Sequence, residues 1–315
     1  MTVINTNVKS LVSQTALSAN SKSLAAAMEQ LSTGKRINSA ADDAAGLAIS
    51  SRMTAQVQGL DQAVRNANDG ISLLQTAEGA LIEMTSMLQR MRELAVQAGN
   101  DTYTSSDRTS LNLEYSQLMQ EINRISQNAQ WNGMIILNNT TTGAATIGTG
   151  GTVAAPATAG SELRNVKFQV GANSSQTISA QFRDFSIPMT AAGVADTTAA
   201  DVSTKVFSGD GKLHDTSITS AANASTAIAR IDVAMNKIND ERATFGAVIN
   251  RLNYAGDNLT NMSLNTTESR SRILDTDYAK ASSELARTQI IQQAATAILA
   301  QANMDKQSVL KLLQA

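Results

Sequence analysis

Residues 53–99 read MTAQVQGLDQAVRNANDGISLLQTAEGALIEMTSMLQRMRELAVQAG, and this stretch decides the fold. Its apolar side chains recur at alternating intervals of three and four residues, which is the heptad spacing of a helix that packs against other helices along its length. At about 1.5 Å per residue such a helix is roughly 70 Å long, and Gly99-Asn100 predicts its end. The seam consists of Met53, Val57, Leu60, Val64, Ala67, Ile71, Leu74, Leu81, Met84, Leu88, Met91 and Ala95.

The seam carries interruptions that a packed helix can absorb. Glu78 breaks the apolar pattern, and Gly70 and Gly79 each cost a helix about 1 kcal/mol relative to alanine. Packing along the whole length offsets such a cost. Small residues at these positions also allow a neighbouring backbone to approach the helix.

The same spacing returns further along the chain. A second helix is expected to begin at a cap between Thr104 and Asp107 and to fold back on the first. Near the other end, Arg242 is the polar exception in another long stripe. It either fixes the register of the seam as a buried polar residue or extends its charged head to solvent. The second helix carries Leu111, Tyr115, Leu118, Ile122 and Ile125, and the stripe near the other end carries Ile228, Ile231, Met235, Ile238, Phe245, Ile249, Leu252 and Leu259.

Shorter amphipathic segments lie at the two ends of the chain. Helices this apolar are not stable alone in water. They must therefore pair with the opposite terminus, pack against other subunits, or stay disordered until they do. The candidates for this assembly seam are Leu24, Met28, Leu31, Leu285, Ile291, Ile298 and Leu312.

Between the helical arms the pattern changes to that of strands. Asn132-Gly133 predicts a turn before a strand over 134–137, and residues 163–170 and 177–187 alternate between apolar and polar. Residues 139–162 and 188–220 are low in complexity and are expected to form polar surface loops. The predicted fold class is mainly α: a long antiparallel coiled-coil helical rod built from both termini, with a small β-hairpin region mid-chain and both termini at one end.

Composition excludes several classes of function. Lys and Arg total 25 against 27 for Asp and Glu, so there is no basic surface for nucleic acid or an anionic membrane. With no cysteine, and His214 as its one histidine, the chain has no thiolate chemistry, catalytic triad or histidine-ligated metal. We therefore expect no enzyme activity and no cofactor. No apolar run approaches the roughly 20 residues of a membrane span, and no cleaved secretory signal is apparent, so export is expected to use another route.

The two arms carry several distinctive motifs: INTN at 4–7, LSTGKRIN at 31–38, AADDAAGLAI at 40–49, QRMRELAVQ at 89–97, DTDYA at 275–279, QIIQQA at 289–294 and LAQAN at 299–303. Together these motifs closely resemble bacterial flagellin. The similarity covers nearly all of residues 1–138 and 222–315, in the same order. It implies a structural protein that self-assembles into the extracellular filament used for swimming, exported by the flagellar secretion apparatus without a cleaved signal. The other partners that it implies are an export chaperone and a filament cap.

The resemblance also implies a division into domains. Residues 1–45 with 276–315 would form an inner coiled-coil domain. Residues 46–138, 163–187 and 221–275 would form a rod domain, and the remaining middle segments are too short for large outer domains.

A second site follows from the resemblance. Flagellins that activate the vertebrate innate immune receptor TLR5 present a stretch similar to 89–97, and the receptor-contact candidates are Gln89, Arg90, Glu93, Leu94, Gln97 and Glu114. Independently, Met87, Arg90, Leu94 and Gln97 share a stripe displaced from the seam, so Leu94 is expected to be exposed and to need a partner. The alternative is that the stripe packs against a neighbouring subunit.

Other protein classes fit the pattern less well. A hook-filament junction protein has similar ends but weaker similarity at 89–97. The cytoplasmic helical hairpin of a chemotaxis receptor would carry a membrane span and no β region. A flagellin with a catalytic insert would need a longer middle segment with histidine ligands.

Overall fold

The computed structural model describes residues 7–138, 163–187, 207, 213 and 216–313, with side chains described as far as residue 304 at the C-terminal end. Within these residues the elements follow the order α1 (Val8–Thr33), α2 (Ala44–Ala98), α3 (Ser105–Asn128), β1 (Gln130–Trp131), β2 (Met134–Ile135), β3 (Leu163–Gln169), β4 (Thr177–Arg183), α4 (Ala221–Leu274) and α5 (Tyr278–Leu313). The predicted mainly-α class with small β-hairpins is confirmed.

The chain divides into two compact units. One comprises Met1–Gln58 and Met262–Ala315, and the other comprises Gly59–Asn261. Helices α2 and α4 each contribute residues to both units. The first unit is therefore built from the two ends of the chain, and the second from one continuous segment.

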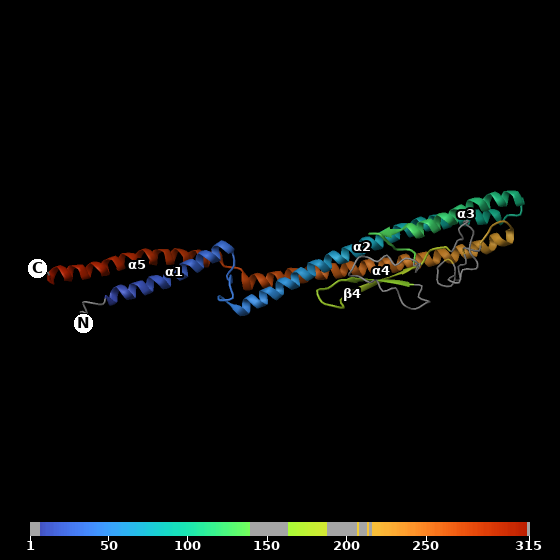
Figure 1. Cartoon of the computed structure of the whole chain (residues 1–315). Helices are drawn as coiled ribbons and strands as arrows, with labels where there is room; N and C mark the ends of the chain where they lie inside the picture. The colour runs from blue at the N-terminus through green and yellow to red at the C-terminus, as the bar shows by residue number, and fades with distance from the viewer. Residues whose placement is uncertain (1–6, 139–162, 188–206, 208–212, 214–215, 314–315) are drawn as a thin grey trace. The chain divides into compact units, whose positions relative to one another are not determined.

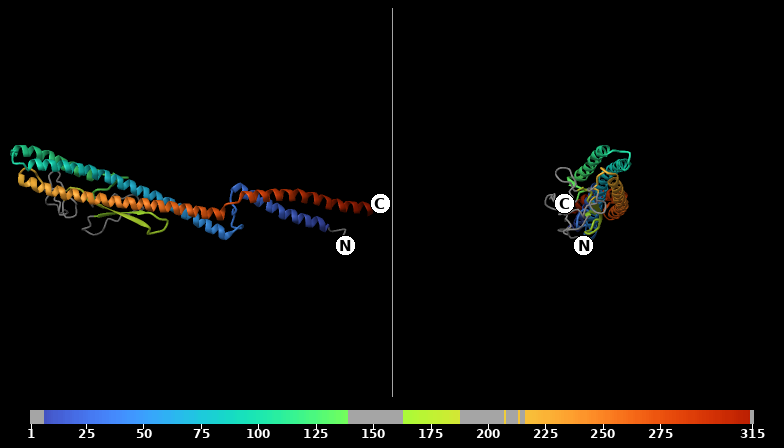
Figure 2. Two further views of the ribbon diagram at one scale, coloured as in Figure 1. Left: turned by 180° about the vertical axis from the view of Figure 1, so that it is seen from behind. Right: turned by 90° about the vertical axis from the view of Figure 1, so that its right-hand side faces the viewer.

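In the first unit, α1 and α5 lie side by side and run antiparallel (Figures 1 and 2). Asn7 caps the start of α1 by accepting a hydrogen bond from the backbone N–H of Ser10. Gly34 ends the helix with φ of 70°, the left-handed conformation that glycine adopts without steric cost. The terminal helices thus pair with each other, which is one of the arrangements that the sequence left open.

In the second unit, α2 and α3 form an antiparallel helical hairpin. Thr104 and Asp107 form the predicted capping box at the start of α3, with hydrogen bonds in both directions. Arg108 donates from Nε to the backbone carbonyl of Ala98 at 2.9 Å and from Nη2 to that of Asn100 at 3.0 Å. Because these carbonyls lie in the last turn of α2 and just after it, the arginine side chain satisfies groups that the helix end leaves unpaired.

Helix α4 packs against the same core. Its buried positions keep the three-and-four spacing, and the core includes Leu74, Leu81, Met84, Ile238 and Phe245, all with 0% of their surface exposed. The polar exceptions of the two predicted seams meet each other, since Arg242 Nη2 lies 3.7 Å from Glu78 Oε1 with both side chains about one-third exposed. The Arg242 side chain therefore reaches the edge of the seam and pairs there with a carboxylate.

Two antiparallel hairpins complete the second unit, each in the place that the sequence predicts. β1 pairs with β2 around Asn132 and Gly133, whose φ values of 46° and 78° are typical of a two-residue type I′ turn. β3 pairs with β4 from Leu163–Arg183 to Gln169–Thr177. Figure 1 shows β4 beside α4.

The β3–β4 hairpin is fixed to the helices by close contacts. A Cβ atom placed on Gly70 of α2 would lie 3.0 Å from the Phe168 ring, and one on Gly59 would lie 3.0 Å from the Ala172 side chain. Phe182 of β4 packs on Phe245 of α4 with ring centroids 5.0 Å apart. The prediction that a neighbouring backbone approaches α2 at Gly70 and Gly79 is therefore wrong in detail, because the neighbour at Gly70 is the Phe168 side chain and nothing lies within 4 Å of a Cβ atom at Gly79.

Most of the two predicted surface loops lies outside the described residues. This holds for all of 139–162 and, in the second loop, for His214. Three described residues of 188–220 correct that prediction. Phe207, Leu213 and Ile218 are fully buried in the core of the second unit, and Phe185 packs on Phe207 with centroids 5.8 Å apart. Isolated large apolar residues in a polar segment can be core anchors, so this segment is not only a surface loop.

Candidate assembly site

The seam between α1 and α5 is built mainly from small and polar residues. Ala27 of α1 is buried opposite a row in α5 whose buried members are Ala281, Thr288 and Ala302. Among the predicted seam residues, Leu24, Leu31 and Leu285 are half-buried in this pair. The seam therefore gains less from burying apolar surface than the core of the second unit does.

Several large apolar side chains of the two helices are instead exposed. Among the predicted seam residues, Met28 is 51% exposed, Ile291 40% and Ile298 59%. Leu312 lies in α5, but its side chain is outside the described residues. Sequence reasoning missed further exposed members, namely Val8, Leu11, Val12, Ile290 and Met304, although the VKSLV run at 8–12 could have indicated those of α1.

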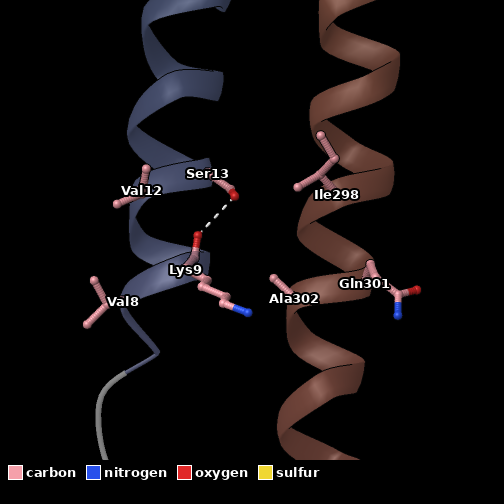
Figure 3. Close-up of a pocket in the computed structure, with 7 residues that line it drawn as sticks. All are labelled: Val8, Lys9, Val12, Ser13, Ile298, Gln301 and Ala302. Carbon is pink, nitrogen blue, oxygen red and sulfur yellow. Dashed lines mark hydrogen bonds between the residues drawn. The ribbon is translucent and has the colours of Figure 1, made fainter. Parts of the chain in front are cut away.

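An open groove of about 510 Å³ separates the two helices near the chain ends (Figure 3). Helix α1 lines it with Val8, Lys9, Val12 and Ser13, and α5 lines it with Ile298, Gln301 and Ala302. The Ser13 hydroxyl donates to the backbone carbonyl of Lys9 within α1, so it does not bridge the groove. Apolar side chains of both helices thus line an open groove that no described residue covers.

The other end of the pair is closed by a joint between the two chain segments. Arg36 donates from its backbone N–H to the carbonyl of Leu274 at 2.7 Å and from Nη2 to that of Ile273, also at 2.7 Å. The backbone N–H of Thr276 donates to the carbonyl of Gly34 at 3.0 Å. This joint fixes the start of α5 against the end of α1.

The predicted receptor-contact residues lie on α2 and α3 in the second unit. Arg90 donates to Glu114 of α3 at 2.9 Å and to Glu93 of α2 at 3.0 Å, and all these side chains are exposed. The hydrogen bonds and charges of Glu114 and Glu93 raise the pKa of Arg90 above its usual value. Gln97 donates to the Tyr103 hydroxyl at 3.0 Å, and Gln89 is exposed. The structure therefore brings Arg90, Glu93 and Glu114 together.

The expectation for Leu94 is wrong. Its side chain is only 1% exposed and belongs to the core. Leu94 and Ala95 are both buried because α2 packs against α3 as well as α4, which widens the buried stripe beyond a single seam. Leu94 can support the Arg90 surface from below but does not belong to it.

No group of three or more histidine, cysteine, aspartate or glutamate side chains in the described part of the chain is placed to hold a metal ion. No helix within that part of the chain is long and apolar enough to cross a membrane.

Comparison with known proteins identifies the family. Residues 4–142 match the model of the bacterial flagellin N-terminal helical region, and residues 228–313 match that of the C-terminal helical region. The chain is 41% identical over 312 residues to a flagellin of Halalkalibacterium halodurans, covering 99% of this chain and 100% of the relative. The chain belongs to the bacterial flagellin family.

Two further relatives show the same full-length similarity, and a solved structure matches part of the chain. A Bacillus subtilis flagellin is 40% identical over 322 residues, with 99% of each chain covered. The flagellar filament core protein flaB2 of Brachyspira hyodysenteriae is 39% identical over 312 residues, covering 99% of this chain and 100% of the relative. A crystal structure of Bacillus cereus flagellin is 30% identical and covers 62% of this chain and 88% of that chain, with a TM-score of 0.41.

Membership of this family assigns the class of function. Flagellins are structural proteins of the flagellar filament, an extracellular appendage, so this chain is a structural filament subunit and not an enzyme.

Proposed function

We propose that this flagellin polymerises through the apolar side chains that α1 and α5 leave exposed. The observation that carries the proposal is the exposure of Val8, Leu11, Met28, Ile290 and Ile298 on helices whose shared seam is mainly small and polar. Fully burying one such side chain contributes about 1.5–3 kcal/mol, so neighbouring subunits that cover these side chains supply a driving force that the isolated pair lacks. The contact must be heterologous and non-closing, because only that geometry gives a helical filament.

The proposed division of labour follows the residues that form each part. Residues 1–45 with 276–315 serve as the inner, assembling domain, and residues 46–138, 163–187 and 221–275 serve as the rod. Before assembly, exposed apolar helices need protection, which supports an export chaperone as a partner. Passage through the flagellar secretion apparatus and a cap at the growing filament end complete the proposed route.

The assembly proposal is tested by making the α5 face polar. In the double variant Ile291→Asn and Ile298→Asn, we expect salt-induced polymerisation to be lost while the helix content of the monomer stays close to that of the unchanged chain. The matched control is Tyr254→Asn on α4, because Tyr254 is 77% exposed but lies in the other compact unit. Electron microscopy and sedimentation measure the polymer, and circular dichroism measures the helix content.

A truncation gives a second test of the same proposal. Deleting residues 283–315 removes most of α5 and should leave the second unit folded but unable to polymerise. Regular filaments from the truncated chain, or from the double asparagine variant, would contradict the proposal.

A second function is proposed for the surface formed by Arg90, Glu93 and Glu114. These residues hold one another in a fixed geometry across α2 and α3, which favours recognition by a partner that pairs with charged groups. We assign to this surface the contact with TLR5, together with exposed Gln89 and Gln97. A neighbouring subunit in the filament is the competing partner.

Receptor activation by the monomer separates these partners. We expect Arg90→Ala to reduce signalling without changing polymerisation. The matched control is Arg124→Ala, since Arg124 forms a similar exposed pair with Glu121 elsewhere on α3. Normal signalling by Arg90→Ala would reject the receptor contact. Because Leu94 is buried, Leu94→Ala measures core stability and is not a test of the contact.

A further inference from the structure

All the sulfur of this chain is in methionine, since it has twelve methionines and no cysteine. In the core of the second unit, Met84 and Met91 have 0% of their surface exposed and Met119 has 5%. An oxidant in solution reaches such sulfur atoms only when the core opens. Four further methionines are half-buried, namely Met53, Met87, Met134 and Met235.

The exposed methionines among the described residues all belong to the first unit. Met28 of α1 is 51% exposed, Met304 of α5 is 62% exposed, and Met262 of α4 is 41% exposed. Met28 and Met304 therefore lie on the two helices whose exposed apolar side chains are proposed to make the contact between subunits. Met262 lies on a different helix and offers an internal comparison.

Met28 and Met304 each continue an apolar surface along their helix. Met28 lies four residues after Leu24 and three before Leu31, so it neighbours both of these half-buried side chains on the surface of α1. Met304 lies two heptads after exposed Ile290, so the two side chains share nearly the same stripe of α5. A neighbouring subunit that covers these surfaces also covers the two thioethers.

The pairing of α1 with α5 uses other groups. Asn20 donates from Nδ2 to the main-chain carbonyl of Thr288 at 2.8 Å, and Asn7 donates from Nδ2 to that of Ala302 at 3.1 Å. The Thr288 and Ala302 side chains are buried in the seam, whereas both methionines are exposed. A chemical change confined to their sulfur atoms should therefore leave the helix pair intact.

We propose that Met28 and Met304 are oxidation sites at which hydrogen peroxide stops this chain from polymerising. The thioether sulfur attacks one peroxide oxygen, so an S–O bond forms and the O–O bond breaks. The sulfur loses two electrons and the peroxide gains them, and the proton of the transferred oxygen moves to the other oxygen, which leaves as water. The product is methionine sulfoxide, which is polar.

The sulfoxide acts on the contact between subunits and not on the fold of one subunit. Its oxygen accepts hydrogen bonds from water while the side chain is exposed. Burying that oxygen against apolar side chains of another subunit removes the water without supplying a donor, which is unfavourable. The inference rests on the proposed function, because it requires that α1 and α5 make this contact.

The first test needs no substitution. The monomer is oxidised partially with hydrogen peroxide, the peroxide is removed with catalase, and polymerisation is induced with salt. Sedimentation separates polymer from unpolymerised chain, and peptide mapping by mass spectrometry measures the sulfoxide at each methionine in both fractions. We expect sulfoxide at Met28 and Met304 to be enriched in the unpolymerised fraction, and sulfoxide at Met262 to be divided evenly.

The size of the effect is measured as the critical concentration for polymerisation. Full oxidation of the exposed methionines should raise it about tenfold or more, the effect of one buried polar group without a partner. Circular dichroism should show a helix content close to that of the untreated chain. Methionine sulfoxide reductases for both sulfoxide epimers should reverse the rise.

Two variants assign the effect to the proposed sites. The double variant Met28→Leu and Met304→Leu keeps apolar side chains of similar volume but has no sulfur at these positions. Peroxide should leave its critical concentration at its own untreated value. The matched control is Met262→Leu, which removes the third exposed sulfur and should keep the full response to peroxide.

The inference would be overturned by an even division of Met28 and Met304 sulfoxide between polymer and unpolymerised chain. A peroxide-induced rise of the critical concentration in the double leucine variant would also overturn it, because other groups would then be responsible. So would a rise that the reductases do not reverse. Failure of the assembly proposal is distinguishable, since the untreated Ile291→Asn and Ile298→Asn chain would then polymerise.

Discussion

The most discriminating test of the packing uses two glycines of α2 that differ in their neighbours. Replacing glycine by alanine inside a helix stabilises it by about 0.8–1 kcal/mol, because alanine loses less backbone freedom on folding. At Gly79, where nothing lies within 4 Å of the new methyl group, we expect the full gain. At Gly70 the methyl carbon would lie 3.0–3.2 Å from ring atoms of Phe168.

The contact at Gly70 changes the sign of the expected effect. Those separations are shorter than ordinary carbon–carbon contacts of about 3.5–4.0 Å, so the Phe168 ring must move. Displacing a packed side chain costs about 1–3 kcal/mol, which offsets the helix gain. Gly70→Ala should therefore be neutral to about 2 kcal/mol destabilising, and it should loosen the β3–β4 hairpin where Asn66 donates to the Gln169 carbonyl at 3.0 Å.

Chemical denaturation measures the free energy of unfolding, and hydrogen exchange of β3 measures the docking of the hairpin. Gly79→Ala serves as the control, because the substitution and the helix are the same. If Gly70→Ala stabilised the chain as much as Gly79→Ala does, the close approach of the hairpin to α2 would be refuted.

The remaining predictions concern single contacts of the second unit. Phe245→Ala, which removes the ring that packs on Phe182, should cost about 3–5 kcal/mol in unfolding free energy by denaturant titration. Thr104→Ala should cost about 1 kcal/mol through loss of the capping box, measured as faster hydrogen exchange in the first turn of α3. Burial raises the pKa of the Glu241 carboxyl above 4.5 despite the Arg183 backbone N–H and charge. The folded chain therefore binds this proton more tightly than the unfolded chain, and its stabilising contribution is complete below pH 4.5 and lost as pH rises through the raised pKa. Glu241→Gln should remove that part of the pH dependence of the unfolding free energy, and an identical pH profile would contradict the assignment.

Much of the fold could be predicted because its signals are local and repeated. The heptads of α2 and α4 extend over many turns, the Thr104–Asp107 cap satisfies backbone donors within its own turn, and Asn132-Gly133 meets the φ requirements of its turn. None of these depends on distant parts of the chain. In the structure, the two long helices, the cap and the turn each lie where the sequence predicts them.

The contacts that sequence patterns predict wrongly, or do not predict, lie where several elements pack together. Leu94 lies on a stripe that a single seam would leave exposed, but α3 covers a second face of α2. The acceptor of Asn20 is a main-chain carbonyl, and no pattern of side chains can indicate which carbonyl lies opposite. Burial of Phe207 depends on Phe185, a contact between segments that have no shared periodicity.

The chain uses one spacing for two physically different helix pairs. Where the inward positions are large and apolar, as at Leu81, Met84 and Leu88, burial within the subunit provides the stability, and the unit needs no neighbour. In α1 and α5 most inward positions are small or polar, and many of the large apolar side chains are exposed. Because the three-and-four interval is common to both, residue size at the inward positions decides whether a pair is complete by itself. A small, polar seam gives up stability within the subunit and leaves apolar surface for contacts between subunits.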